Sequence, residues 1–140
     1  MRISDCGVIE RNYGMNSNEF KERIRAFALR IIHLVESLPR KRIADVVGGQ
    51  LLRSGTSVVS NYRAACRAKS TADFISKMGT VEEEADETLY WMELLLEDGI
   101  VEVSLLEPLM KEADEIVAIT VSSIKTARKN NRIRTGKVRD

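Results

Sequence analysis

The chain has few of the residues that mark catalytic, metal-binding or cross-linked proteins. Its 140 residues include one histidine, two cysteines and two prolines, and aromatic residues make up only 5%. The two cysteines, Cys6 and Cys66, are too few and too far apart in sequence for a disulfide framework or a zinc site. Charged residues interrupt every apolar run, so no segment has the roughly 20 apolar residues that a membrane-spanning helix requires.

Targeting signals are also missing from the sequence. The amino-terminal segment MRISDCGVIERNYG lacks the continuous apolar core of a signal peptide. With so few cysteines and no apolar segment of that kind, we expect a protein of the reducing cytoplasm without a membrane anchor.

Four stretches carry apolar residues at spacings of three and four, which is the pattern of amphipathic helices. They predict helices at about 17–38, 42–68, 71–98 and 104–130. Capping boxes are expected from Asn16 or Ser17, from Ser70 and from Ser104, and Gly99 suits a left-handed helix stop. The last apolar stripe begins with Leu105. We expect one domain at 16–130, a flexible arm at 1–15 and a basic flexible tail at 131–140.

The segment LLRSGTSVVSNYRAACRAKS, residues 51–70, is rich in small residues yet keeps helical spacing. Glycine, serine and threonine lower helix propensity, so this helix forms only because its neighbours require it. Small side chains allow a neighbouring backbone to come close. With short connections, the four helices predict an all-α, antiparallel, up-down-up-down four-helix bundle.

Candidate catalytic groups are weak. The carboxylates of residues 82–87 lack the Glu-x-x-His pairs of di-iron bundles, and they more simply form a solvated face with one or two side chains directed towards a basic neighbour. His33 fits a boundary or core position better than a ligand position. Cys66 fits a small buried apolar side chain better than a nucleophile. We therefore expect no enzyme activity, no cofactor and no metal.

Charge is strongly segregated along the chain. Residues 82–115 hold 13 acidic residues and one base, Lys111, while the rest of the chain is basic. Clustered bases neutralise phosphates without reading sequence. The candidate nucleic-acid-binding residues are Arg53, Arg63, Arg67, Lys69, Arg128, Lys129, Arg132 and Arg134. A solvated surface or an ion-pair seam between subunits remains the alternative. Tyr90 and Trp91 suit either base stacking or an anchoring contact.

The segment Gln50 to Val101 resembles a bacterial four-helix-bundle family. That family includes proteins encoded in intervening sequences of large-subunit ribosomal RNA genes and the accessory variability determinant of diversity-generating retroelements. The matching positions are Gln50, Arg53, Ser57, Asn61, Ser70, Phe74 and Glu87. Where many members have Asn-Ile-Ala-Glu-Gly, this chain has Asn-Tyr-Arg-Ala-Ala at 61–65, so the glutamate of the family is missing.

The resemblance implies a left-handed bundle that assembles into a homopentamer and has no catalytic centre. For the retroelement relatives it implies a basic surface that engages nucleic acid and a reverse transcriptase. We therefore expect a non-enzymatic, homo-oligomeric scaffold or adaptor associated with RNA or DNA, with a reverse transcriptase or another protein as a further partner. The alternative is a protein–protein interaction module with no nucleic-acid role, whose charges only build the oligomer.

Overall fold

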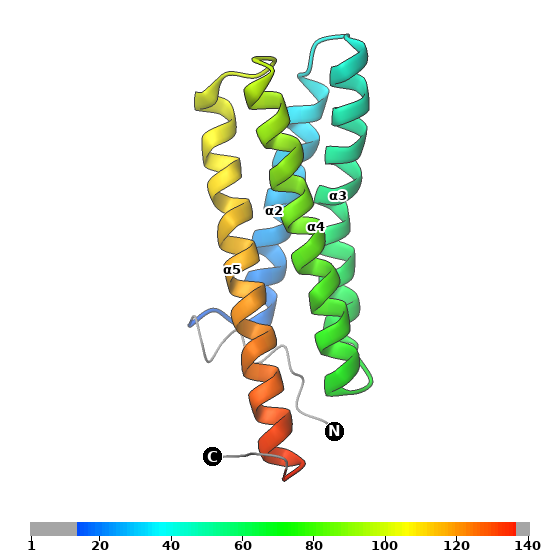
Figure 1. The fold of residues 1–140 in the computed structure, drawn as a ribbon, viewed down its shortest axis with the longest axis vertical. Coiled ribbons are helices and arrows are strands. Elements are labelled where there is room, and N and C mark those ends of the chain that lie inside the picture. Colours follow the sequence, from blue (N-terminus) through cyan, green and yellow to red (C-terminus); the bar gives the residue numbers. More distant parts are fainter. Residues whose placement is uncertain (1–13, 137–140) are drawn as a thin grey trace.

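Four long helices account for nearly all of the structure (Figure 1). The computed structural model describes residues 14–136, in which α2 (Ser17–Glu36), α3 (Arg42–Cys66), α4 (Thr71–Glu97) and α5 (Val103–Arg134) follow one another without a strand. The all-α prediction is confirmed. Most of the predicted amino-terminal arm and the last residues of the predicted tail lie outside the described residues.

The helices form a closed cycle in chain order. Within the described residues, α3 packs against α2 and α4, and α5 packs against α4 and α2, whereas the Cα atoms of the two diagonal pairs do not come within 8 Å of each other. The α2–α3 and α4–α5 connections lie at the end drawn uppermost in Figure 1, called here the upper end. The α3–α4 connection and the start of α2 lie at the lower end. The molecule is therefore the predicted antiparallel up-down-up-down bundle.

The starts of two helices confirm the predicted caps. The Asn16 side chain accepts a hydrogen bond from the Glu19 backbone N–H at 2.8 Å and donates one to the Glu19 carboxylate at 2.7 Å. Ser70 accepts from the Asp73 N–H at 3.0 Å. Each pair satisfies backbone donors that the first helical turn leaves unpaired. Gly99, with φ +74°, follows α4 in the left-handed conformation expected of a helix stop.

The two ends of α5 differ from the prediction. The helix begins at Val103, within one residue of the predicted position, but its N-cap is Glu102, which gives no side-chain cap, so the predicted capping box at Ser104 is wrong. It continues to Arg134, beyond the predicted end at 130, and residues 131–134 are helical. Arg132 and Arg134 lie in its last turn. Their positive charges favour that extension because the carboxyl end of a helix carries a partial negative charge.

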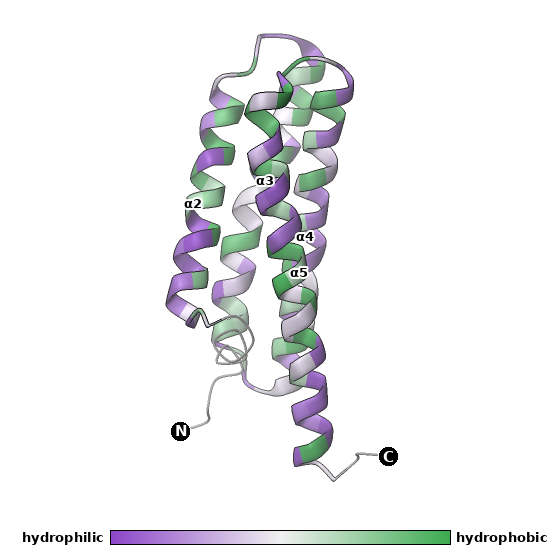
Figure 2. Cartoon of the chain, turned by 90° about the vertical axis from the view of Figure 1, so that its left-hand side faces the viewer, coloured by the Kyte–Doolittle hydropathy of each residue, from purple (hydrophilic) through white to green (hydrophobic). Residues whose placement is uncertain are grey.

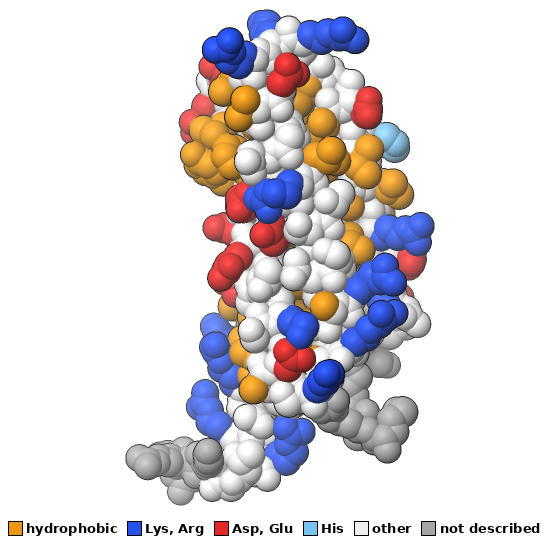
Figure 3. Space-filling model, turned by 90° about the vertical axis from the view of Figure 1, so that its right-hand side faces the viewer, with side chains coloured by type: hydrophobic (Ala, Val, Ile, Leu, Met, Phe, Trp, Pro, Cys, Tyr) orange, Lys and Arg blue, Asp and Glu red, His pale blue; other side chains and the backbone are white. Residues whose placement is uncertain are grey.

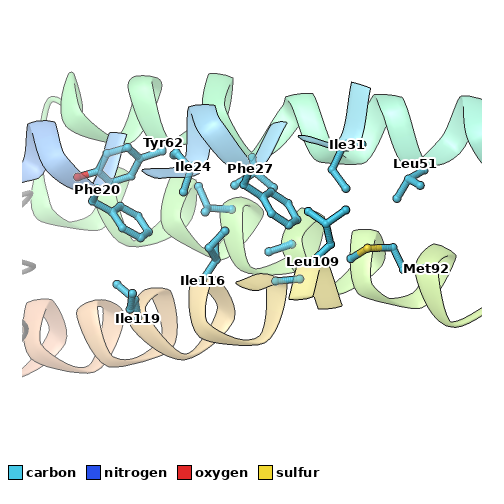
Figure 4. Close-up of a cluster of buried hydrophobic side chains, with 14 of the residues drawn as sticks. Phe20, Ile24, Phe27, Ile31, Leu51, Tyr62, Met92, Leu109, Ile116 and Ile119 are labelled. Carbon is cyan, nitrogen blue, oxygen red and sulfur yellow. The ribbon is translucent and has the colours of Figure 1, made fainter. Parts of the chain in front are cut away.

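A continuous apolar core runs between the helices. Figure 2 shows that hydrophobic and hydrophilic residues alternate along each helix, as expected for helices with one buried face. Figure 4 shows the central layers, in which side chains from all four helices point into the same space. The largest fully buried ones are Tyr62, Phe20, Phe27, Phe74, Ile24, Ile31, Leu51, Met78, Met92, Leu95 and Leu106. Tyr62 and Phe20 meet edge to face with ring centroids 4.9 Å apart.

The small residues of α3 lie where the helix packs most closely against its neighbours. A Cβ atom added to Gly55 would lie 3.0 Å from Cγ2 of Ile31 on α2, closer than ordinary van der Waals contact. On the α4 side, Thr88 Oγ1 lies 2.8 Å from Ser54 Oγ in a buried hydrogen bond. The small-residue segment is therefore a helix that touches both neighbours, as predicted.

None of the helices in the described part of the chain has the length and apolar character needed to cross a lipid bilayer.

Candidate nucleic-acid interface

Arg53, one of the predicted nucleic-acid-binding residues, is engaged within the fold. Its guanidinium hydrogen bonds with Glu84 at 3.1 Å, with Glu87, and with the Gln50 side chain at 3.0 Å. These carboxylates raise the pKa of Arg53 above its usual value, against the opposing effect of desolvation. Arg53 therefore joins α3 to α4. Glu84 and Glu87 are the members of the carboxylate run that face a basic neighbour.

Most of the other predicted bases gather at the lower end of the bundle. Arg63 and Arg67 lie in the last turn and C-cap of α3, Lys69 lies in the α3–α4 connection, and the predicted bases of α5 lie in its last three turns. Two bases of α2, Lys21 and Arg25, lie near the same end. We call this set the basic end; its members are Lys21, Arg25, Arg63, Arg67, Lys69, Arg128, Lys129, Arg132 and Arg134.

Three of these bases surround one hollow. Lys21 and Arg25 lie one turn apart on α2, and together with Arg63, Val59 and Glu22 they line a hollow of about 520 Å³ between α2 and α3. Within residues 14–136, none of the three bases makes an ion pair. One carboxylate, that of Glu22, opposes three positive charges, so the hollow attracts anions.

The bases of α5 continue the basic end towards the α3–α4 connection. The Arg134 guanidinium donates hydrogen bonds to Thr71, the first residue of α4, and to Asn131. Arg128, Lys129 and Arg132 are exposed on the same segment and make no ion pair within the described helices. Figure 3 shows Lys and Arg side chains over the lower half of one face and at the upper tip, with acidic side chains concentrated between them.

Acidic groups at the basic end are few and partly neutralised. Asp73 pairs with Lys77 at 2.5 Å and accepts a hydrogen bond from the Lys69 backbone N–H at 3.2 Å. The Lys77 hydrogen bond is the main reason that the pKa of Asp73 is lowered. The positive charge of this end is therefore only weakly offset by its own carboxylates.

The positions shared with the resembled family hold the α3–α4 contact together. Glu87 accepts a hydrogen bond from the Trp91 indole at 2.9 Å as well as from Arg53, which links Gln50, Arg53, Glu87 and Trp91 in one chain of contacts. Asn61 donates to the Ser57 carbonyl at 2.8 Å. Ser70 caps α4, and Phe74 is buried. Gln50, Arg53 and Glu87 therefore join α3 to α4, whereas Ser70 lies beside Lys69 at the basic end.

The Tyr90–Trp91 pair lies on the upper half of α4, away from the basic end. Trp91 is partly buried and hydrogen bonded to Glu87, whereas Tyr90 is 51% exposed and its ring centroid lies 5.0 Å from that of Trp91. Trp91 thus has an anchoring contact within the chain.

The remaining candidate groups are placed as follows. Cys66 is disulfide-bonded and half-buried, so the expectation of a small, fully buried apolar side chain is wrong. Its sulfur lies 3.5 Å from Ser17 Oγ. His33 is exposed near the end of α2, rather than at a boundary or core position.

Burial raises the pKa of Tyr62 to about 12, and the Tyr62 hydroxyl lies 3.1 Å from Ser17 Oγ. Across residues 14–136, His, Cys, Asp and Glu side chains form no group of three able to hold a metal ion.

A second ion-pair group closes the seam between α2 and α5. Arg23 binds Glu112 through two nitrogens, each at 2.7 Å, and Glu115 at 2.5 Å. The hydrogen bond from Arg23 is the main cause of a lowered pKa at Glu112. The negative stretch at 82–115 is therefore neutralised in two places, by Arg53 and by Arg23, and is exposed elsewhere.

Three bases of α2 with a part in these contacts, Lys21, Arg25 and Arg23, were not predicted from the sequence. The first two are spaced one helical turn apart, which places them on one face, but only the packing of α2 beside α3 brings Arg63 to the same hollow. Arg23 lies 89 residues from Glu112 in sequence, and no local pattern relates two residues so far apart.

Comparison with known proteins agrees with the fold. The model of the 23S rRNA-intervening sequence protein family matches residues 16–122. No match is found among curated proteins. A crystal structure from Bacteroides thetaiotaomicron, described as a protein of unknown function from the S23 ribosomal protein family, shares 38% sequence identity. The similarity covers 77% of this chain and 96% of that one, with a TM-score of 0.72. The chain therefore belongs to the 23S rRNA-intervening sequence protein family.

Proposed function

We propose that this protein is a non-enzymatic, homo-oligomeric adaptor that binds the phosphate backbone of RNA through its basic end. The observation that supports this proposal is the convergence of bases from α2, α3 and α5 on one end of the bundle, around a hollow lined by Lys21, Arg25 and Arg63. Membership of a family named after intervening sequences of 23S rRNA favours RNA as the polyanion.

The chemistry of the basic end suits backbone contacts better than base recognition. Lysine and arginine bind phosphate oxygens, and binding of this kind releases counterions and weakens steeply with salt. Sequence-specific recognition of single-stranded RNA instead relies on aromatic platforms and hydrogen bonds to base edges. Among residues 14–136, the strongly exposed aromatic residue is Tyr90, which lies on the upper half of the molecule. We therefore expect binding with little sequence preference.

Fluorescence anisotropy with a labelled single-stranded RNA tests the proposal over a range of salt concentrations. For single strands, the slope of log K against log salt is about 0.7 per neutralised phosphate. The double variant Arg63→Ala/Arg67→Ala removes two exposed bases and should reduce the slope by about 1.4 and weaken binding at low salt. Circular dichroism confirms that the variant is folded.

Arg30→Ala is the matched control. Arg30 is an exposed arginine in the upper half of α2, outside the basic end, and its loss should leave the slope unchanged. The mass of each variant is measured in parallel, because a change of assembly alters apparent affinity. An absence of binding at low salt, or equal losses in Arg30→Ala and the double variant, would contradict the RNA-binding role.

A further inference from the structure

An open groove lies between α4 and α5 in the upper half of the bundle, on the side away from the α2–α3 hollow. It has a volume of about 470 Å³. Its apolar lining residues are Leu89, Leu96, Val103 and Met110. Val103 is 55% exposed. The side chains that line this groove therefore leave apolar surface in contact with water.

The rim of the groove is negatively charged. Three carboxylates, Glu93, Glu107 and Asp114, line it together with one base, Lys111. None of these three carboxylates forms an ion pair within residues 14–136, in contrast to Glu84, Glu87, Glu112 and Glu115. We call this surface the acidic groove. A complementary occupant has exposed aliphatic side chains flanked by positive charges.

The same chain carries such a surface at its upper tip. Arg40, Lys41 and Arg42 are exposed at the α2–α3 connection and the start of α3. They are followed on α3 by Ile43 and Val46, which are 48% and 58% exposed and lie about one turn apart. Within the described residues, none of the three bases makes an ion pair. We call these five residues the basic ridge.

We propose that the basic ridge of one copy docks into the acidic groove of a second copy. Ile43 and Val46 would cover the apolar floor, and Arg40, Lys41 and Arg42 would face the three unpaired carboxylates of the rim. The inference specifies the self-association contained in the proposed function. It does not depend on nucleic-acid binding, because neither surface includes a residue of the basic end.

Other segments of the chain fit the groove less well. The carboxyl-terminal part of α5 is basic, but within residues 14–136 Ile133 is the one large apolar side chain that it exposes strongly. Leu29 and Leu105 are exposed to a similar degree but lie outside both surfaces, on α2 and α5. Among residues 14–136, the ridge combines two strongly exposed aliphatic residues, about one turn apart, with three adjacent bases that outnumber the one exposed carboxylate between them, Asp45.

The contact is heterologous, because each copy offers a ridge on α3 and a groove between α4 and α5. Heterologous contacts produce rings when the rotation between copies closes, and filaments when it does not. Both surfaces belong to the upper half of the bundle (Figure 1), so the proposed contact does not involve the lower end. This arrangement leaves the basic ends of all copies exposed.

Two double variants test the two surfaces of the proposed contact one at a time. Ile43→Gln/Val46→Gln removes the apolar part of the ridge, and Glu93→Lys/Glu107→Lys makes the groove repel the ridge. Sedimentation velocity should show that each variant alone dissociates at concentrations about tenfold or more above those at which the unaltered protein dissociates. All four positions are surface positions, and circular dichroism verifies the helical content.

Mixing the two variants gives the decisive measurement. The intact ridge of the groove variant can dock into the intact groove of the ridge variant, while the altered ridge and altered groove do not bind each other. An equimolar mixture should therefore form a capped dimer of twice the 15.8 kDa subunit mass and nothing larger. Leu29→Gln/Leu105→Gln is the matched control, since these leucines are 48% and 60% exposed, and it should assemble like the unaltered protein.

Three outcomes would overturn the docking. The first is an unaltered protein that stays monomeric at every concentration tested. The second is an equal loss of assembly in the leucine control. The third is a mixture that remains monomeric although the unaltered protein assembles. Binding of RNA by folded, monomeric ridge variants would show that the proposed function survives the loss of this inference.

Discussion

At the scale of single residues, Gly55 sets the distance between α2 and α3. Its hydrogen atom faces Ile31, whose Cγ2, Cγ1 and Cβ would lie 3.0, 3.2 and 3.3 Å from an added methyl group. Ile31 is fully buried, so it has little room to move. The close approach explains why a residue with poor helix propensity stands in the middle of a 25-residue helix.

We predict that Gly55→Ala destabilises the protein by about 1 kcal/mol. The gain in helix propensity, about 1 kcal/mol, is outweighed by an overpacking cost of about 1–3 kcal/mol. Gly49→Ala on the same helix meets no atom within 4 Å and should stabilise by roughly 0.5–1 kcal/mol. Urea denaturation measures both. A stabilised Gly55→Ala would show that α2 and α3 can separate without loss.

The buried hydrogen bond between Thr88 and Ser54 makes a second residue-scale prediction. Thr88→Val keeps the shape of the side chain but leaves Ser54 without this partner, which should cost about 1 kcal/mol. In a double-mutant cycle, the additional loss from Ser54→Ala should be smaller in the Thr88→Val background than in the unaltered protein. Additive effects would mean that the two hydroxyls are not coupled.

At the scale of the helices, the seam between α2 and α5 is the least closely packed of the four. A hollow of about 280 Å³, lined in part by Arg30, Leu34 and Leu105, opens in its upper half. Below it, the contacts of Arg23 with Glu112 and Glu115 join the two helices. Ion pairs therefore join this sparsely packed seam, as the pairs of Arg53 with Glu84 and Glu87 join the more closely packed α3–α4 seam.

The seam should give the protein an acid-sensitive component of stability. The pKa of Glu112 is lowered from 4.5, mainly by the hydrogen bond from Arg23, with a smaller contribution from the charge of Arg30. A carboxylate with a lowered pKa in the folded state stabilises fully above its unfolded pKa. That contribution is lost as the pH falls through the folded pKa. The free energy of unfolding should therefore decrease below about pH 4.5.

We predict that Glu112→Gln lowers the free energy of unfolding by roughly 1 kcal/mol at pH 7 and makes it less dependent on pH in the acid range. Denaturant titrations between pH 3 and 7 measure both effects. Glu83→Gln, which removes the same charge from an exposed site on α4, serves as the control. If Glu112→Gln and Glu83→Gln both lose stability in acid as steeply as the unaltered protein, the α2–α5 seam does not contribute an acid-sensitive part of the free energy of unfolding.

Helix positions were predictable because they depend on local patterns. The caps at Asn16 and Ser70 satisfy their own first turns, so neighbouring residues contain the necessary information. The start of α5 was less predictable, because Leu105 and Leu106 both stand at helical spacing from Leu109. The expected stripe began with Leu105, which is 60% exposed, whereas Leu106 is fully buried. Packing against α2 and α4 decides between them.

The candidate site was predictable only in part, and the reason is tertiary. A base in a sequence gives no indication of whether a carboxylate of another helix lies opposite it. Arg53 and Arg63 occur ten residues apart on α3, yet Arg53 faces Glu84 and Glu87 while Arg63 faces the hollow with Lys21 and Arg25. The sequence predicted that both arginines belong to a basic surface. Only their contacts with residues of neighbouring helices show that the two have different surroundings.

At the scale of the whole molecule, the basic ends and the proposed docking surfaces are separate, so assembly should present several basic ends to one RNA. Linked binding sites raise the apparent affinity for a ligand long enough to reach more than one of them. A long RNA should therefore bind the unaltered protein roughly tenfold or more tightly than it binds Ile43→Gln/Val46→Gln, whereas a short RNA should bind both equally. Anisotropy with RNAs of two lengths measures the difference, and equal ratios would rule out multivalent binding.

The closed cycle of helices gives the fold a further property. Each helix packs against the one before it and the one after it, and α5 packs against α2. The set of helix neighbours would therefore be the same whichever helix came first in the chain. The start of α2 and the end of α5 lie at the same end of the bundle. Joining those two ends and opening the α3–α4 connection would create a circular permutant with every helix neighbour retained, and such a chain should reach the same architecture from a different starting point.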